Sequence, residues 1–335
     1  MIGTRTPFRI SFVGGGSDMK DFYKYHDGAV LSTSIDKYIY IFIHSYFENK
    51  IQVKYSKTEL VDKIKNVEHP IVRELLKQFE QTGIDINSIA DIPSGTGLGS
   101  SSSFSVGLIH ALYAYKNKLV SSSRLAKDAS NLEINILKEP IGKQDQFAAA
   151  YGGFNIIRFF KNEHVDIQPI IAEQSTIKEL QENLIMFYLG KRRKASQILK
   201  DQKKNIIDDS EKIKTLYSMT KLVDELAMSI ANADLKQFGK ILNENWELKR
   251  SLSKKITNDD IDECYKLGLN NGAIGGKLLG AGGGGFMLFY CPKKNHSRLR
   301  KTFYKLKELN FRFERTGSKI IYIADNDKRI WKKNE

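Results

Sequence analysis

The sequence predicts an α+β protein with two domains. Its 335 residues are enough for about two ordinary domains. Strand-like and helical segments alternate in the first half, whereas helical periodicity fills most of the segment from Ala195 to Leu252. The end of the chain returns to strand-like segments that are separated by a helix. This order suits an α+β sandwich, and we expect the domain boundary between residues 165 and 180.

Each expected element of the first half follows from the spacing of its apolar residues. Alternation or a short apolar run predicts a strand, and a three-to-four residue step predicts a helix. The strands are expected at Phe8 to Val13, Tyr38 to His44, Ile51 to Tyr55 and Phe154 to Phe160. The helices are expected at Pro70 to Gln81, from about Ser100, at Leu125 to Ile136 and at Gln144 to Tyr151.

The second half has fewer expected strands. Leu184 to Leu189, Phe286 to Tyr290 and Lys319 to Ala324 have strand-like patterns, and a helix is expected around Ser297 to Glu308. We expect these elements, with the helices before them, to form the second domain. Residues 325 to 335 look like a charged tail.

The composition indicates a globular protein without membrane spans. The longest apolar runs, such as Tyr38 to Ile43, are far shorter than the roughly 20 residues that cross a bilayer, and no export signal precedes the first strand-like segment. Cys264 and Cys291 are the only cysteines, too few for a disulfide framework or a cysteine-based zinc site. We therefore expect a cytoplasmic protein with no membrane partner.

The formal net charge of +14 indicates either a surface that binds polyanions or a lysine-rich solvated exterior. Basic residues occur throughout the chain. Local clusters such as Lys191 to Lys194 are neither followed by heptads nor interleaved with aromatic residues. This distribution favours the solvated exterior, and no nucleic-acid partner is expected.

The most informative stretch is PSGTGLGSSSSFSVG, at residues 93 to 107. Phe104, Leu108, Leu112 and Tyr115 recur at helical spacing, so the serines lie at a helix start. Unpaired N–H groups at a helix N-terminus favour phosphate, and glycines allow the ligand to approach closely. A serine-capped helix would explain one serine and two glycines, but not GTGLG followed by four serines. We therefore expect a phosphate-binding loop.

Two other nucleotide-binding patterns do not fit. The P-loop pattern is absent, because its nearest approach, Asn271 to Leu278, lacks the first glycine and the final Ser/Thr. Gly280, Gly282 and Gly285 match the dinucleotide pattern, but a strand-like segment follows them instead of a helix.

A loop that holds nucleotide phosphates requires further groups. A magnesium ion needs a carboxylate beside a hydroxyl, and phosphoryl transfer benefits from a proton acceptor and a cation. Glu133, Asp145 and Arg9 are candidates. Taken singly, Glu133 would be a solvated helix residue, Asp145 a helix cap or surface charge, and Arg9 half of a structural ion pair.

Three motifs together resemble those of the GHMP kinase superfamily: TPFRISFVGGGSD at 6 to 18, the serine loop at 93 to 107 and KLLGAGGGGF at 277 to 286. The resemblance covers nearly the whole chain. It implies the two-domain GHMP kinase fold, with a ribosomal-protein-S5-like N-terminal ATP-binding domain at 1–170 and a ferredoxin-like α/β-sandwich C-terminal domain at 171–335. It also implies an enzyme that phosphorylates an alcohol group of a small molecule with ATP and Mg²⁺, as a monomer or homodimer.

The resemblance assigns roles to the residues that match its motifs. It implies that Asp145 accepts the proton of the substrate hydroxyl beside Arg9, and that Ser101 and Glu133 bind Mg²⁺. The loop from Gly280 to Gly285 is expected mainly to support the floor of the site. The expected ATP-binding residues are Gly95, Gly97, Leu98, Gly99, Ser100, Ser101 and Ser102.

The first motif narrows the substrate. Galactokinase-type members read G-E-H-T-D where this chain has a triple glycine followed by Ser-Asp, which is similar to heptose 7-phosphate kinases and fucokinases. The basic cluster in YLGKRRKASQIL, at 188 to 199, is expected to bind a substrate phosphate through Arg193, with Lys191 and Arg192 as alternates; a lysine-rich surface is the other interpretation. The expected substrate-binding residues are Gly14, Gly15, Gly16, Ser17, Asp18, Arg193, Gly282 and Gly283.

The implied reaction is phosphorylation of the anomeric hydroxyl of a heptose 7-phosphate, to give a 1,7-bisphosphate for surface polysaccharide. Two alternatives stay open. One is an anomeric kinase of an unphosphorylated sugar such as fucose, and the other is a non-catalytic protein that binds a ligand.

Overall fold

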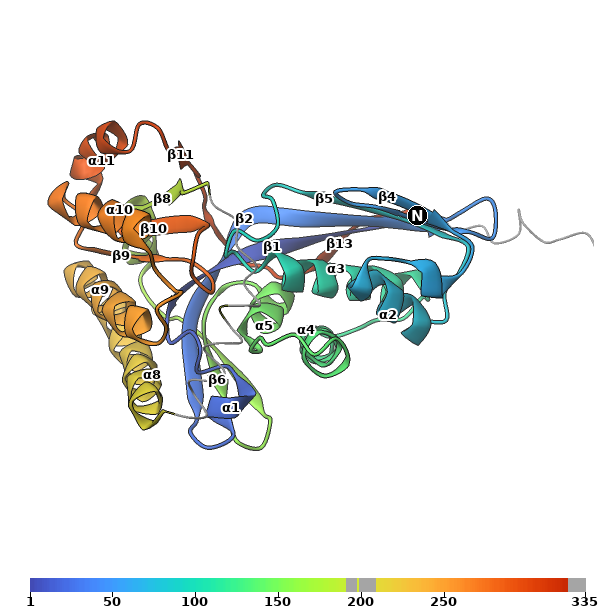
Figure 1. Ribbon diagram of the computed structural model, residues 1–335, viewed down its shortest axis with the longest axis horizontal. Helices are drawn as coiled ribbons and strands as arrows, with labels where there is room; N and C mark the ends of the chain where they lie inside the picture. The colour runs from blue at the N-terminus through green and yellow to red at the C-terminus, as the bar shows by residue number, and fades with distance from the viewer. Residues whose placement is uncertain (191–197, 199–208, 325–335) are drawn as a thin grey trace, which may run out of the picture.

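The computed structural model describes residues 1–190, 198 and 209–324. Two β-sheets organise this part of the chain (Figure 1). The larger has nine described strands in the order β13-β1-β2-β5-β3-β4, with β6 and β12 also paired to β2 and β7 paired to β6. The strands of this sheet are β1 (Ile2–Val13), β2 (Gly28–Ser45), β3 (Ile51–Lys54), β4 (Thr58–Val61), β5 (Ile84–Ala90), β6 (Phe154–Phe159), β7 (Val165–Pro169), β12 (Phe313–Glu314) and β13 (Lys319–Ile323).

Strands β1 and β2 form the long antiparallel pair at the centre of the larger sheet. The second half of β2 alternates as an amphipathic strand should: Ile39, Ile41 and Ile43 are buried, while the residues between them are partly exposed. Its first half is buried throughout, and α5 (Gln144–Tyr151) and α8 (Ser210–Ala231) are among the helices that pack on β2. The sequence predicted only the second half, since the irregular register near Asp36 and Lys37 interrupts the alternation.

Helices α2 to α5 cover one face of this sheet (Figure 1). Helix α3 begins at Ser100, as the sequence predicted, and its Gly107 packs so closely on β1 that a Cβ would lie 2.8 Å from Thr6 Oγ1. The expected helix from Leu125 to Ile136 is confirmed, but its second half is a π-helical turn. The helical segments of this half are α1 (Lys20–Tyr23), η1 (Ile64–Asn66), α2 (Pro70–Gln78), α3 (Ser100–Tyr115), α4 (Ser122–Ser130), the π-turn η2 (Asn131–Ile136) and α5 (Gln144–Tyr151).

The smaller sheet is antiparallel and has the strand order β11-β8-β10-β9. Helices α9 and α10 pack on β9, and α8 pairs with α9 at the junction with β1 and β2. The strands are β8 (Leu184–Tyr188), β9 (Gly275–Leu278), β10 (Phe286–Tyr290) and β11 (Lys307–Glu308). The described helices are α6 (Gln174–Glu182), α8 (Ser210–Ala231), α9 (Leu235–Ser251), α10 (Asp259–Asn270), the short η3 (Lys293–Asn295) and α11 (His296–Thr302).

The end of the described chain departs from the prediction. The strand expected at Lys319 to Ala324 exists as β13, but it pairs with β1 of the larger sheet, with Ile2 opposite Ile323. The sequence order had indicated that this strand belongs to the second sheet, and that prediction is wrong. The residue pattern of a strand indicates which of its faces is buried but not which strand it pairs with, so the pattern could not predict the pairing of β13 with β1. The expected helix from Ser297 to Glu308 is also shorter, because it ends at Thr302 and β11 follows.

The described residues include no helix that is long and apolar enough to cross a membrane. The charged tail expected at residues 325 to 335 lies outside the described part of the chain.

Candidate active site

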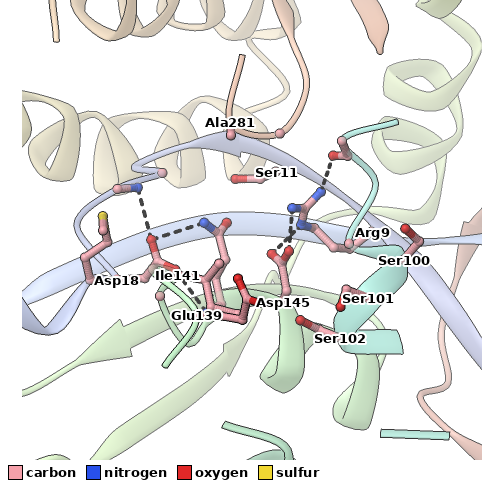
Figure 2. Close-up of a pocket in the computed structure, with 18 of the residues that line it drawn as sticks. Arg9, Ser11, Asp18, Ser100, Ser101, Ser102, Glu139, Ile141, Asp145 and Ala281 are labelled. Carbon is pink, nitrogen blue, oxygen red and sulfur yellow. Dashed lines mark hydrogen bonds and ion pairs between the residues drawn. The ribbon is translucent and has the colours of Figure 1, made fainter. Parts of the chain in front are cut away.

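A cavity of about 260 Å³ lies where β1, the loop before α3, the start of α5 and the loop after β9 meet (Figure 2). Both halves of the chain contribute to its wall, since α9 supplies Lys249, β9 supplies Lys277 and the loop after β9 supplies Gly280. Most of the residues that the sequence predicted for the site line it: Arg9, Gly15, Gly16, Asp18, Gly95, Gly97, Gly99, Ser100, Ser101, Ser102, Glu133 and Asp145.

The loop before α3 has the geometry of a phosphate cradle. Gly95, Gly97 and Gly99 all have a positive φ, between 77° and 88°, a backbone region that favours glycine. Gly99 is the N-cap and provides no side chain to cap α3. The first N–H groups of a 16-residue helix therefore face this side of the cavity, where an anion fits them.

Glu133 is held by three hydrogen bonds. Ser101 and Ser102 donate their hydroxyls to its two carboxylate oxygens, over 3.1 and 2.7 Å, and Gln146 Nε2 donates over 2.6 Å. The π-helical turn carries Glu133 to this position, where burial raises the pKa of its carboxyl against the opposing effect of the three donors. Ser101 is the exposed one of the two serines.

This group of oxygens fits a small divalent cation. The Ser101 hydroxyl and the Glu133 carboxylate both line the cavity next to the phosphate cradle, and Mg²⁺ prefers such oxygen ligands together with substrate phosphates. Among the described residues, no group of three or more His, Cys, Asp or Glu side chains is arranged so that it could hold a metal ion. A cation here would therefore be held by few protein ligands and by the ligand's phosphates.

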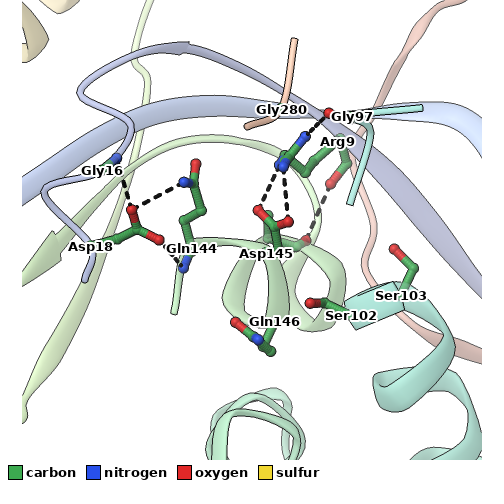
Figure 3. Close-up of polar contacts among 12 residues, drawn as sticks. Arg9, Gly16, Asp18, Gly97, Ser102, Ser103, Gln144, Asp145, Gln146 and Gly280 are labelled. Carbon is green, nitrogen blue, oxygen red and sulfur yellow. Dashed lines mark hydrogen bonds and ion pairs between the residues drawn. The ribbon is translucent and has the colours of Figure 1, made fainter. Parts of the chain in front are cut away.

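Asp145 and Arg9 form a bidentate ion pair at the centre of the site (Figure 3). Arg9 Nε and Nη2 donate to Asp145 Oδ1 and Oδ2, each over 2.8 Å, and Arg9 Nη1 donates to the Gly97 carbonyl over 2.7 Å. A Cβ on Gly99 would lie 3.4 Å from Asp145 Oδ2. The carboxylate is thus fixed in orientation beside the phosphate cradle, in the first turn of α5.

Asp18 lies at the other end of the cavity. Its carboxylate accepts hydrogen bonds from Gly16 N over 3.0 Å and from Gln144 N and Nε2 over 3.2 and 3.1 Å (Figure 3). Burial raises the pKa of Asp18, and the negative charge of Asp145 adds to this effect. Gly142 makes room for the carboxylate, since a Cβ there would lie 2.0 Å from Asp18 Oδ2.

Several predicted ligand-binding residues do not reach the cavity. Leu98 is fully buried, and its carbonyl accepts from Arg9 N over 3.1 Å. Gly14 and Ser17 support the turn, where the Ser17 hydroxyl lies 2.8 and 2.9 Å from the carbonyl oxygens of Gly14 and Ala29 and donates to one of them at a time. Gly282 and Gly283 pack on the backbone of Ile256. Arg193, with its alternates Lys191 and Arg192, lies outside the described residues.

Ser11, Gln144, Lys249 and Lys277 are among the cavity residues that the sequence did not reveal. Ser11 and Gln144 each have a buried oxygen without a hydrogen-bond partner among the described residues, Ser11 Oγ and Gln144 Oε1. Ser11 follows Arg9 by two positions on one strand, which was an available signal because such residues share a face. Nothing in the sequence around Lys249 or Lys277 indicated a site residue. Lys249 fits an ordinary helix pattern, and Lys277 fits an ordinary strand pattern.

Comparisons with known proteins agree with this architecture. Residues 56–153 match the GHMP kinases N terminal domain and residues 226–308 the GHMP kinases C terminal domain. The D-glycero-alpha-D-manno-heptose 7-phosphate kinase of Campylobacter jejuni is 29% identical over 89% of this chain and 92% of its own length. The bifunctional fucokinase/GDP-fucose pyrophosphorylase of Arabidopsis thaliana is 27% identical over 92% of this chain, which is 30% of that longer protein.

Solved structures extend the likeness to the fold. A D-glycero-D-manno-heptose 1-phosphate kinase from Bacteroides thetaiotaomicron superposes with a TM-score of 0.80, over 97% of this chain and all of that one, at 20% identity. The two domain matches together cover more than half of the sequence, and these likenesses agree with them. The chain belongs to the GHMP kinases, which transfer a phosphoryl group from ATP to an alcohol group.

Proposed function

We propose that this GHMP kinase is a sugar kinase that phosphorylates the anomeric hydroxyl of D-glycero-D-manno-heptose 7-phosphate. The product is the 1,7-bisphosphate, a precursor of nucleotide-activated heptose for surface polysaccharide, made in the cytoplasm. The observation that carries the proposal is the Arg9–Asp145 pair, which lies between a phosphate cradle and a pocket of unpartnered polar oxygens. The likeness to the Campylobacter jejuni heptose 7-phosphate kinase supports the choice of sugar.

In this mechanism Asp145 is the general base. Its carboxylate accepts the proton of the anomeric hydroxyl as that oxygen forms its bond to phosphorus. Arg9 holds both carboxylate oxygens in plane and adds a positive charge beside the group in transfer. The bond between the transferred phosphorus and the bridging oxygen of the nucleotide breaks at the same time, and ADP leaves. A Mg²⁺ ion held by Ser101 and Glu133 would offset negative charge on the nucleotide phosphates.

The other residues orient the two ligands. Gly95, Gly97, Gly99 and the N-terminus of α3 hold the nucleotide phosphates, and Ser101 and Glu133 hold Mg²⁺. On the sugar side, Ser11 and Gln144 offer unpartnered oxygens beside the buried Asp18 carboxylate. Sugar hydroxyls are complementary to this set, because each of them both donates and accepts.

A kinase for an unphosphorylated sugar such as fucose is the second candidate. The likeness to the Arabidopsis thaliana fucokinase favours it, and the residue chosen to separate the two, Arg193, lies outside the described residues. A non-catalytic ligand-binding protein is disfavoured by the Arg9–Asp145 pair, because binding alone needs no oriented carboxylate beside a phosphate cradle.

The test is magnesium-dependent ADP release with a panel of acceptors: heptose 7-phosphate, fucose, galactose and mevalonate. We expect turnover only with heptose 7-phosphate, and a new phosphate on the anomeric carbon when the product is examined by ³¹P NMR. Turnover with fucose would support the kinase activity and show that the substrate is an unphosphorylated sugar, not heptose 7-phosphate. Absence of turnover with every acceptor would contradict the proposal and favour the non-catalytic alternative.

A further inference from the structure

Two lysines are buried in the wall of the active-site cavity. Lys249, on α9, and Lys277, on β9, are 6% and 2% exposed, yet both line the cavity. Lys249 Nζ donates to the carbonyl of Gly280, and Lys277 Nζ donates to the carbonyl of Phe12 over 2.7 Å. An ammonium group has three donors, so each lysine has capacity left for a ligand.

Neither ammonium group is neutralised by a carboxylate. Among the ion pairs of the described residues, Asp145 is paired with Arg9, and neither lysine has a partner. Burial lowers the pKa of Lys249 to about 8; Arg9 adds to this, and Asp18 and Asp145 oppose it. The pKa of Lys277 is also lowered, by burial and by the charges of Lys249 and Arg9. Burying cations without partners is costly, and such groups are frequent where a ligand provides the missing charge.

The lysines lie near the cradle that holds the nucleotide phosphates. Gly280 packs directly on Gly97, since a Cβ on Gly280 would lie 2.4 Å from Gly97 Cα. Lys249 is bound to the carbonyl of that same Gly280. Lys277 is bound to the carbonyl that follows Ser11 on β1. The two ammonium groups thus lie along the wall that joins the cradle to the sugar side.

We propose that Lys249 and Lys277 form an anion-binding wall of the active site, which holds a phosphate group of a bound ligand. The inference rests on the proposed function, because it assigns these lysines to the ligands of that same site. The phosphate has two sources: the terminal phosphoryl group of the nucleotide, or the phosphate of the sugar. In either case the ligand supplies a negative charge in direct contact with the two ammonium groups, whereas Asp18 and Asp145 act on Lys249 only from a distance.

A purely structural role for the lysines and a ligand-binding role predict opposite effects of mutation on stability and on phosphate binding. If Lys249 served only to tie the Gly280 carbonyl to α9, its loss would destabilise the protein and leave ligand binding unchanged. If Lys249 is an uncompensated cation kept for a ligand, removing its charge stabilises the ligand-free protein and weakens phosphate binding.

The experiment compares Lys249→Met and Lys277→Met with the wild-type protein, and with Lys240→Met, an exposed lysine on the same helix, as the control. Melting temperatures are measured without ligand and over a titration with inorganic phosphate. We expect both buried-lysine variants to melt higher than the wild type without ligand and to bind phosphate at least tenfold more weakly. The control should match the wild type.

A lower melting temperature without ligand, or an unchanged phosphate affinity, would overturn the proposal. If Lys249→Met does not fold, Lys249→Gln is measured in the same way, because it keeps a donor for the Gly280 carbonyl and removes the charge.

Two further arms identify the source of the phosphate. If the wall holds the terminal phosphoryl group, the affinity of Lys249→Met for the non-hydrolysable analogue AMP-PNP with Mg²⁺ should fall at least tenfold, to that for ADP. If the wall holds the sugar phosphate, AMP-PNP binding is unchanged and the KM for heptose 7-phosphate rises at least tenfold, while the KM for fucose does not. No change in either arm would refute the inference.

These readouts separate the inference from the proposed function. Phosphate and AMP-PNP binding do not depend on which sugar is the acceptor. A wild-type enzyme that does not turn over heptose 7-phosphate would refute the proposed function, and the response of the lysine variants to phosphate would still decide the role of the wall.

Discussion

Three carboxylates in one cavity have different surroundings, which suit the different roles that we propose for them. Asp145 is paired with Arg9, Glu133 accepts from two hydroxyls and an amide, and Asp18 accepts mainly from backbone and amide N–H groups. A proton acceptor, a metal ligand and a partner for sugar hydroxyls need these different environments. The sequence motifs indicated all three residues, but not the partners that distinguish them.

Replacement of Glu133 by Gln tests the metal site. Loss of the carboxylate charge should lower kcat about 10²-fold and raise the Mg²⁺ concentration needed for half-maximal rate, because the cation loses an anionic ligand. ADP release measured over a Mg²⁺ titration checks this. Glu139→Gln, an exposed acid on the rim of the same cavity, is the control and should keep the wild-type Mg²⁺ dependence. An unchanged Mg²⁺ titration in Glu133→Gln would remove that residue from the metal site.

At the scale of elements, the loop before α3 packs against the glycine loop after β9. Gly97 and Gly95 provide a matched pair of substitutions. Both have a positive φ, so alanine costs each about 1–2 kcal/mol of backbone strain. Only at Gly97 would the new Cβ meet another loop, 2.4 Å from the Leu279 carbonyl, whereas nothing lies within 4 Å at Gly95.

We therefore expect Gly97→Ala to raise the KM for ATP about 10-fold. This factor corresponds to about 1.4 kcal/mol, the cost that we assign to the contact with Leu279 in addition to the backbone strain that both variants share. Gly95→Ala should change it much less. Steady-state kinetics on both variants checks this. Equal effects would mean that backbone strain alone, and not the contact between the loops, shapes the cradle.

The predictability of the elements depended on how local their cause is. The start of α3 was predictable, because Gly99 and the apolar spacing that follows it both lie within this one helix and its cap. The partner of β13 was not, since pairing with Ile2 joins residues at opposite ends of the chain. Likewise, Lys249 and Lys277 reach the cavity only through the packing of α9 on β9 and on β1.

At the scale of the whole molecule, the candidate active site is lined by residues from the elements of both sheets, and Figure 1 shows how these two parts of the chain meet. Charged side chains from both halves face one another there. Lys249 of α9 faces Arg9 of β1, Lys277 of β9, and the carboxylates of Asp18 and Asp145. Stability is thus coupled to the protonation of a group that belongs to the site.

The pH dependence of stability tests this coupling. Because burial lowers the pKa of Lys249 from 10.5 to about 8, the unfolded chain binds a proton that the folded protein lacks between about pH 8 and 10.5. The free energy of unfolding should therefore rise with pH in that window, by about 3 kcal/mol from this lysine. Below about pH 8 both states are protonated, and the full cost of burial remains.

Thermal denaturation of Lys249→Met and the wild type from pH 7 to 10.5 measures this effect. The variant should be the more stable protein at pH 7, and its advantage should shrink as the pH rises. A difference that does not change with pH would show that Lys249 carries no buried charge.

The most direct test of the central claim is the activity and nucleotide binding of Asp145→Asn. Asparagine keeps the shape of the side chain and removes its ability to accept a proton. We predict that kcat falls about 10²–10⁴-fold, the usual contribution of a general base, while the dissociation constant for AMP-PNP with Mg²⁺ stays close to that of the wild type. Full activity in Asp145→Asn would contradict the account.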